Sequence, residues 1–174
     1  MITKRDQDII NFVEDFHIAT SKQIHRLFFP NTSIQYRCER LRYLCREKLL
    51  KRTRSTIDNC YAYYVKKHSQ VHHDLLRAEL FVNIKAQYNL LEWSNEMTIG
   101  SIRPDALAYI ERGLPLMIEI HLSNRFDFEK YDTDFLPVFG THPRIVICTD
   151  KTLRLPDRRY RIVTTDMQGL DRLL

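Results

Sequence analysis

The sequence is poor in glycine and proline, with four and six among 174 residues. So few of these residues argue against a long flexible linker. A hydrophobic fraction of 44% is enough to build a core, which excludes disordered, collagen-like and low-complexity chains. The length suits one domain or two small ones.

Long apolar runs and paired cysteines are also missing. No run approaches the roughly 20 apolar residues that a membrane helix needs, and residues 1–6 lack the apolar core of a signal peptide. We therefore expect a soluble, cytoplasmic protein without a membrane partner. The four cysteines, at 38, 45, 60 and 148, form no CxxC pair, so neither a zinc knuckle nor a disulfide framework is indicated. Core packing is the favoured role of Cys38 and Cys45, with redox or metal chemistry as the alternative.

Positive charge is concentrated near the N-terminus. The whole chain has 27 Lys and Arg against 22 Asp and Glu, a formal net charge of +5. Residues 1–67 hold 14 basic and 7 acidic residues, net +7, whereas residues 68–174 hold 13 and 15, net −2. The basic first part favours a polyanionic partner such as DNA.

Residues 1–67 are predicted to form a winged helix-turn-helix domain. Apolar residues from 9 to 16 recur at helical spacing behind a capping signal at Thr3 and Asp6, which predicts a helix over 4–16. Thr20 or Ser21 can cap a second helix over 21–29, and Ser33 can cap a third that runs to about residue 49. Alternation over 49–55 and 60–67 then predicts a basic hairpin. Three helices followed by such a hairpin are typical of a winged helix.

The third predicted helix and the hairpin carry the candidate DNA-binding residues. At 100° per residue, Tyr36, Arg40 and Tyr43 lie together opposite the apolar face. Tyrosine can bond phosphates and arginine can bind guanine in the major groove, although the same side chains could instead pack on a second domain or subunit. Three hairpin residues are expected near the phosphate backbone, in contacts that salt weakens: Lys51, Arg52 and Arg54.

Residues 68–174 predict a second domain with the element order αβββαβ. Helical periodicity covers 71–84, and strands are indicated at 90–93, 103–110 and 114–122, the last two joined as a hairpin by residues 111–113. A helix over 125–135, a buried strand over 144–149, a strand over 160–164 and a short terminal helix complete the domain. The expected fold class is therefore α+β, in two domains.

Two acidic residues occupy adjacent predicted strands. Asp105 and Glu119 would repel each other unless a cation joined them, and a hard divalent ion such as Mg²⁺ is the usual solution. Glu79, on the preceding helix, could supply a third oxygen ligand. Such a site can orient water against a phosphodiester. The structural alternative pairs Asp105 with Arg103 or Arg125 and leaves Glu119 facing solvent.

Histidines and further acids are assigned structural roles. The spacing of His72-His73-Asp74 splays adjacent helical side chains by about 100° and favours a surface or capping role. No ligand role is assigned to His17, His25, His68 or His142. A solvated helix face is the favoured interpretation of Asp127, Glu129, Asp132 and Asp134.

The acidic motifs carry a resemblance. Arg103-Pro104-Asp105 followed by Ile118-Glu119-Ile120-His121 resembles the PD-(D/E)xK restriction-endonuclease fold. Together with segments 3–6 and 19–24, the chain resembles the replication-relaxation family of Gram-positive plasmids, conjugative elements and phages. That family joins a winged helix to a nuclease-like domain and is associated with plasmid replication and DNA relaxation. The resemblance covers most of the chain, through short motifs.

The resemblance implies catalytic positions, with one departure. Asp105 and Glu119 match the metal-binding acids, and Glu79 matches the helical acid. Where the motif has lysine two residues after the second acid, this chain has His121, which can act as a base or ligand but does not reproduce a long ammonium. Lys130 on the next predicted helix could supply the ammonium instead. Without either group, the pocket would bind DNA or a partner without catalysis.

Three functions are compatible with these observations. The first is a cytoplasmic DNA-binding protein of a mobile genetic element that assists replication, relaxation or transfer, with double-stranded DNA and a replication or relaxase protein as partners. The second is a Mg²⁺- or Mn²⁺-dependent nickase or endonuclease with a degenerate motif. The third is a transcriptional regulator whose second domain mediates assembly, for which a homodimer is expected.

Overall fold

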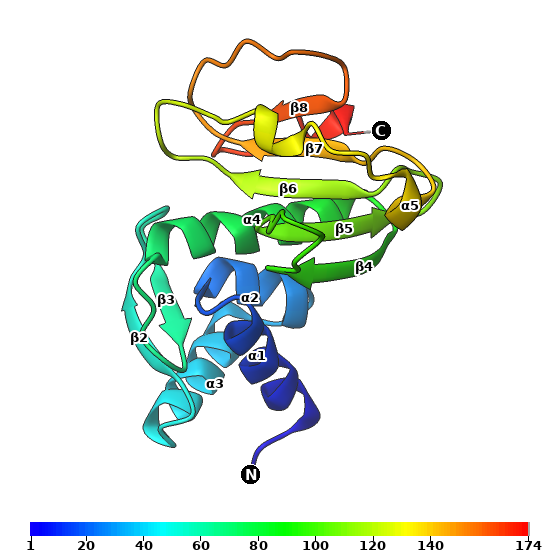
Figure 1. Cartoon of the computed structure of the whole chain (residues 1–174). Helices are drawn as coiled ribbons and strands as arrows, with labels where there is room; N and C mark the ends of the chain where they lie inside the picture. The colour runs from blue at the N-terminus through cyan, green and yellow to red at the C-terminus, as the bar shows by residue number, and fades with distance from the viewer. Residues whose placement is uncertain (174) are drawn as a thin grey trace. The chain divides into compact units, whose positions relative to one another are not determined.

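The computed structural model describes residues 1–173 (Figure 1). The chain divides into two units, Met1–Val82 and Asn83–Leu174. Within residues 1–173 the fold is α+β, with five α-helices and two β-sheets. The units divide inside helix α4 (Val71–Gln87), whereas the sequence placed a domain boundary between residues 67 and 68. None of the helices in the described range is both long enough and apolar enough to span a membrane.

Three helices open the first unit close to their predicted positions: α1 (Lys4–Asp15), α2 (Ser21–Phe28) and α3 (Ile34–Arg46). Each is preceded by a capping residue whose side-chain oxygen accepts a backbone N–H of the first turn, namely Thr3, Thr20 and Ser33. Such caps satisfy donors that the helix itself leaves unpaired. The predicted capping signals therefore mark the true helix starts, while α3 ends three residues earlier than expected.

A three-stranded antiparallel sheet completes the first unit. Strands β2 (Lys51–Arg54) and β3 (Tyr61–Tyr64) form the predicted hairpin. The sequence did not predict β1 (Ala19–Thr20), which pairs with β3 and gives the order β1-β3-β2. Two residues are too few to show the alternation by which strands are detected.

The second unit contains a five-stranded mixed sheet with the order β4-β5-β6-β7-β8 (Figure 1). Neighbouring pairs are antiparallel from β4 to β6 and parallel from β6 to β8. The strands lie where the sequence predicted them, although β5 begins three residues later than expected. Their bounds are Leu90–Asn95, Ala106–Ile110, Leu116–Ile120, Arg144–Cys148 and Tyr160–Val163.

The prediction of a helix over 125–135 is wrong. That segment contains only a 3₁₀ turn, η1 (Glu129–Tyr131), and the single-turn helix α5 (Leu136–Phe139) follows it. Four aromatic residues of the segment pack on the core of the second unit: Phe126, Phe128 and the buried Tyr131 and Phe135. Phe128, Tyr131 and Phe135 keep the i, i+3, i+7 spacing of one helix face, so periodicity alone could not exclude a helix here. The predicted terminal helix is likewise a 3₁₀ turn, η2 (Leu170–Arg172).

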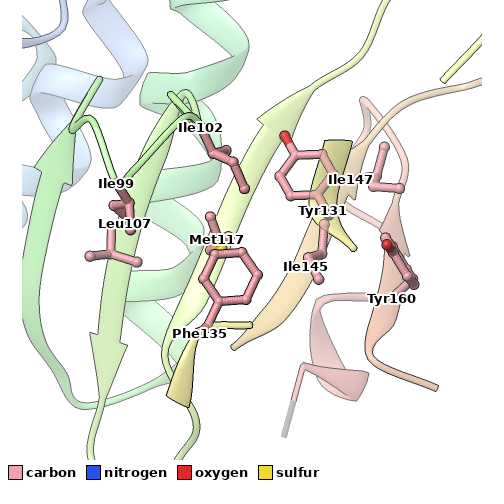
Figure 2. Packing of buried hydrophobic residues seen from close by; sticks show 9 residues of the cluster. All are labelled: Ile99, Ile102, Leu107, Met117, Tyr131, Phe135, Ile145, Ile147 and Tyr160. Carbon is pink, nitrogen blue, oxygen red and sulfur yellow. The ribbon is translucent and has the colours of Figure 1, made fainter. Parts of the chain in front are cut away.

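One face of the five-stranded sheet carries a hydrophobic core (Figure 2). Leu107 of β5 pairs with Met117 of β6, which pairs with Ile145 of β7, so these three side chains share that face. Tyr131 and Phe135 pack against them from the segment between β6 and β7. Because side chains alternate along a strand, Glu119 of β6 belongs to the same face as Met117.

Candidate functional site

Arg40, a predicted DNA contact, is bound inside the first unit. Its Nε donates to Oδ1 of Asp6 at 2.6 Å, and its Nη2 donates to the carbonyl of Met1 at 2.8 Å and to Oδ2 of Asp6. The guanidinium lies 4.5 Å from the ring centre of Tyr43, whose hydroxyl accepts a hydrogen bond from the N-terminal ammonium at 3.0 Å. The Asp6 side chain is only 1% exposed and that of Arg40 19%. To reach a base, Arg40 would have to break a buried ion pair.

The charges of this pair stabilise each other. Burial by itself raises the pKa of Asp6, but the hydrogen bonds from Arg40 and Thr3 and the charge of Arg40 outweigh burial and lower the pKa to about 2. The pKa of Arg40 is raised, chiefly by its hydrogen bond to Asp6. Both groups are therefore charged at neutral pH, and the pair connects α3 with α1.

The most exposed face of α3 lies beside the face of Tyr36, Arg40 and Tyr43 that was predicted to contact DNA. Gln35, Glu39, Arg42 and Arg46, spaced four, three and four residues apart, are all exposed. Tyr36 is 46% exposed at the start of the same helix. Arg42 and Arg46 were not among the DNA contacts predicted from the sequence. Their spacing places them on one helix face and could have revealed them.

The hairpin exposes all four residues of β2, including the predicted Lys51, Arg52 and Arg54. The guanidinium groups of Arg52 and Arg54 lie 4.6 and 4.8 Å from the ring centre of Tyr61, which is exposed. Each such cation–π contact is worth about 0.5–1 kcal/mol at an exposed site. Tyr61 therefore orders two arginines side by side on the hairpin.

Exposed arginines lie both on α3 and on β2, the strand that follows it in the chain. Burial raises the pKa of the Cys45 thiol on α3, and the charge of Arg52 acts in the opposite direction. We refer to Arg42, Arg46, Arg52 and Arg54 as the arginine surface. Residues 1–82 contain 15 basic and 9 acidic residues, so this unit has a net charge of +6.

Glu79 has partners within the first unit. Its Oε1 accepts a hydrogen bond from Nη1 of Arg26 at 2.7 Å, and its Oε2 accepts one from Nε2 of Gln23 at 2.9 Å. These bonds connect α4 with α2. Asp105 and Glu119, the two acids that were predicted to share a metal ion with Glu79, belong to the second unit.

Asp105 directly precedes β5, and Glu119 lies on the neighbouring strand β6. Ala106 pairs with Ile118 in this antiparallel ladder, and Asp105 and Glu119 are the next residues along the chain from that pair. Oδ2 of Asp105 accepts the backbone N–H of Ile120 at 2.7 Å. Nζ of Lys130, on η1, lies 2.9 Å from Oε1 of Glu119. The structure thus brings Lys130 to the second acid, although no helix carries it there.

His121 occupies a less polar place at the end of β6. Its ring meets Phe126 edge-on at 5.0 Å between centres, and its Nε2 lies 3.5 Å from Oγ of Ser123. Burial lowers the pKa of His121, and the charge of Lys151 lowers it further. The imidazole is therefore neutral at pH 7 and does not replace the cation of a lysine.

Neither a cluster of metal ligands nor a comparison with known proteins identifies a function for the site around Asp105 and Glu119. Among residues 1–173, no group of three His, Cys, Asp or Glu side chains is placed to hold a metal ion. Arg103, one structural partner considered for Asp105, pairs with Glu96 at 2.5 Å. No protein-family model, curated protein or solved structure matches the chain.

Proposed function

We propose that the chain is a DNA-binding protein of a mobile genetic element. Its first unit is a winged helix that binds duplex DNA through α3 and the β2–β3 hairpin, and its second, nuclease-like unit assists replication, relaxation or transfer. The observation that carries the proposal is the arginine surface, exposed on a helix and an adjoining hairpin. The mobile element is inferred from the resemblance of the sequence motifs to the replication-relaxation family.

The element order supports the assignment of the first unit. A helix, a short strand, two helices and a hairpin whose second strand pairs with the first strand are typical of winged helices that place the last helix in the major groove. In this arrangement Arg42 and Arg46 face the DNA from α3, and Tyr36 stands at the helix start. Arg52 and Arg54 bind phosphates from the hairpin. Arg40 positions α3 through Asp6.

Fluorescence anisotropy with a labelled duplex tests this proposal. Replacing Arg42 and Arg46 together by alanine should weaken binding at least about tenfold, because charge-assisted hydrogen bonds to phosphate or guanine are lost. The matched control replaces Arg154 and Arg158, two exposed arginines of the second unit, and should retain affinity. Equal affinities for both double variants would contradict the proposed DNA-binding face.

A metal-dependent endonuclease is a second candidate, favoured by the contact between Lys130 and Glu119. Mg²⁺ commonly takes one or two carboxylates in protein sites, so Asp105 and Glu119 would suffice to hold it together with water and a phosphate. The metal would polarise the phosphodiester and activate water. Lys130 would orient Glu119 and oppose the developing negative charge.

A plasmid assay tests this candidate. Supercoiled plasmid is incubated with the protein and Mg²⁺ or Mn²⁺, alongside Glu119→Gln and Lys130→Met variants purified in parallel. Nicking that both substitutions abolish supports the enzyme. Nicking that survives in both variants reports a contaminant, and it contradicts the proposed site, as does intact plasmid with every divalent ion.

A further inference from the structure

We propose that the first unit also binds a nucleotide, in a cavity beside the hairpin to which the sequence assigned no function. The cavity has a volume of about 250 Å³. The turn after α1, the two hairpin strands and the start of α4 enclose it. The lining combines an apolar floor with a cationic rim, which is the arrangement expected of a small-molecule site.

The floor of the cavity is formed by Ile18, Tyr64 and Val71. Ile18 is buried with Ala62 and Leu75, and the partly buried Tyr64 and Val71 pack against that cluster. The floor is thus a fixed part of the core, with an aromatic ring at its surface. A flat nucleobase would remove apolar surface from water here and could stack on the tyrosine.

The rim of the cavity carries the charge. Arg54 and Lys67 line it from exposed positions, together with His17 and His68. No acidic side chain of the described residues lines this cavity. Guanidinium and ammonium groups beside an apolar surface match a phosphate attached to a base. The adjacent cavity of about 260 Å³ differs, because Glu14 lines it together with Lys66.

His68 is oriented by a buried acid. The sequence favoured a surface or capping role for His72-His73-Asp74, but Asp74 is 1% exposed, and its Oδ2 lies 2.5 Å from Nδ1 of His68. Arg77, which is fully buried, holds the other carboxylate oxygen at 3.2 Å. The ring of His68 also contacts the ring of His17, with 4.4 Å between centres and a tilt of 32° between the ring planes. Because Asp74 occupies Nδ1, Nε2 is the ring nitrogen that can meet a ligand.

Arg54 connects the cavity with the arginine surface. It lines the cavity and also lies over Tyr61 on the exposed hairpin. A bound phosphate would therefore compete with DNA phosphates for the same guanidinium, and by linkage each ligand would weaken the other. This coupling rests on the proposed DNA binding, whereas nucleotide binding does not.

Calorimetric titration of the full chain without DNA tests the site. The ligands are dTMP, thymidine and inorganic phosphate, together with a trinucleotide carrying either a 5′-phosphate or a 5′-hydroxyl. We expect saturable binding of one dTMP per chain, and about tenfold weaker binding of thymidine and of phosphate.

Lys67→Ala should weaken dTMP binding about tenfold, and Val71→Phe should abolish it by filling the floor. Lys66→Ala, in the adjacent cavity, is the matched control and should bind normally, with thermal melting verifying that each variant is folded.

The results separate the possible sources of the nucleotide. Tighter binding of the 5′-phosphorylated trinucleotide than of dTMP supports the site and makes a DNA end its ligand, whereas tighter binding of dTMP supports a free nucleotide. Absence of saturable binding by both overturns the proposal, as does equal weakening by Lys67→Ala and Lys66→Ala. If dTMP binds but duplex DNA does not, the cavity site stands and the proposed DNA-binding function fails. If both bind independently, the coupling through Arg54 is refuted.

Discussion

The guanidinium of Arg40 on α3 is bound to the carboxylate of Asp6 on α1, across 34 positions of the sequence. The pair fixes the orientation of α3 and leaves its neighbouring face, with Arg42 and Arg46, open to solvent. The residue that looked most like a base-reading arginine is therefore a support for the helix. Substitution of Arg40 should therefore affect folding stability and DNA binding differently from substitution of Arg42 or Arg46.

Replacing Arg40 by alanine should destabilise the first unit by about 3 kcal/mol, because Asp6 would be left as a buried charge without its partner. Arg42→Ala removes an exposed side chain of the same helix and should change the unfolding free energy by less than about 0.5 kcal/mol. Urea denaturation followed by circular dichroism measures both. Similar losses in the two variants would contradict the supporting role of Arg40.

The same carboxylate should make stability depend on pH. The pKa of Asp6 is lowered from 3.8 to about 2 in the folded chain, so the unfolded chain binds the proton more tightly. The resulting contribution, about 2 kcal/mol, is fully present above pH 3.8 and is lost as the pH falls through about 2. The measurement is the difference in unfolding free energy between the wild type and Asp6→Asn from pH 7 to pH 2. A difference that stays constant over this range would refute the assignment.

The hairpin arginines should determine the salt dependence of DNA binding. Replacing Arg52 and Arg54 together by alanine removes two phosphate contacts, which should reduce the slope of log K against log salt by about 1.8. Affinity for unrelated duplexes should fall equally, since phosphate contacts carry no sequence information. Titrations at several salt concentrations measure the slope. An unchanged slope would remove the hairpin from the proposed interface.

Substituting Asp105 should lower the stability of the second unit, which complicates the use of Asp105 variants in activity assays. Asp105→Ala leaves the N–H of the buried Ile120 without this acceptor, at a cost of about 2 kcal/mol. Asp105→Asn keeps a carbonyl oxygen in the same place and should cost less. Thermal melting of the two variants provides the comparison. Equal melting temperatures would indicate that the hydrogen bond contributes nothing measurable. If Asp105→Ala melts lower, Asp105→Asn is the better variant for testing Asp105 by plasmid nicking.

Much of the fold was predictable because it depends on neighbours in the sequence. Thr3, Thr20 and Ser33 cap helices through backbone groups three residues away, and the five strands of the second unit follow local apolar runs. The separation of charge, with the basic excess near the N-terminus, likewise required only composition. Arg42 and Arg46 could also have been identified, since helical spacing places them on one face.

Other features were decided only by tertiary structure. The strand β1 exists because β3 provides its partner, and the aromatic side chains of residues 125–135 pack on the sheet although the segment forms no α-helix. The pairs Arg40–Asp6 and Lys130–Glu119 likewise join side chains from different elements. Periodicity predicts which face of an element a side chain occupies, but the partner on that face depends on how distant segments pack. For this chain, the sequence therefore determined most of the elements and the charge separation, and the tertiary structure decided which arginines are exposed and which hold the fold.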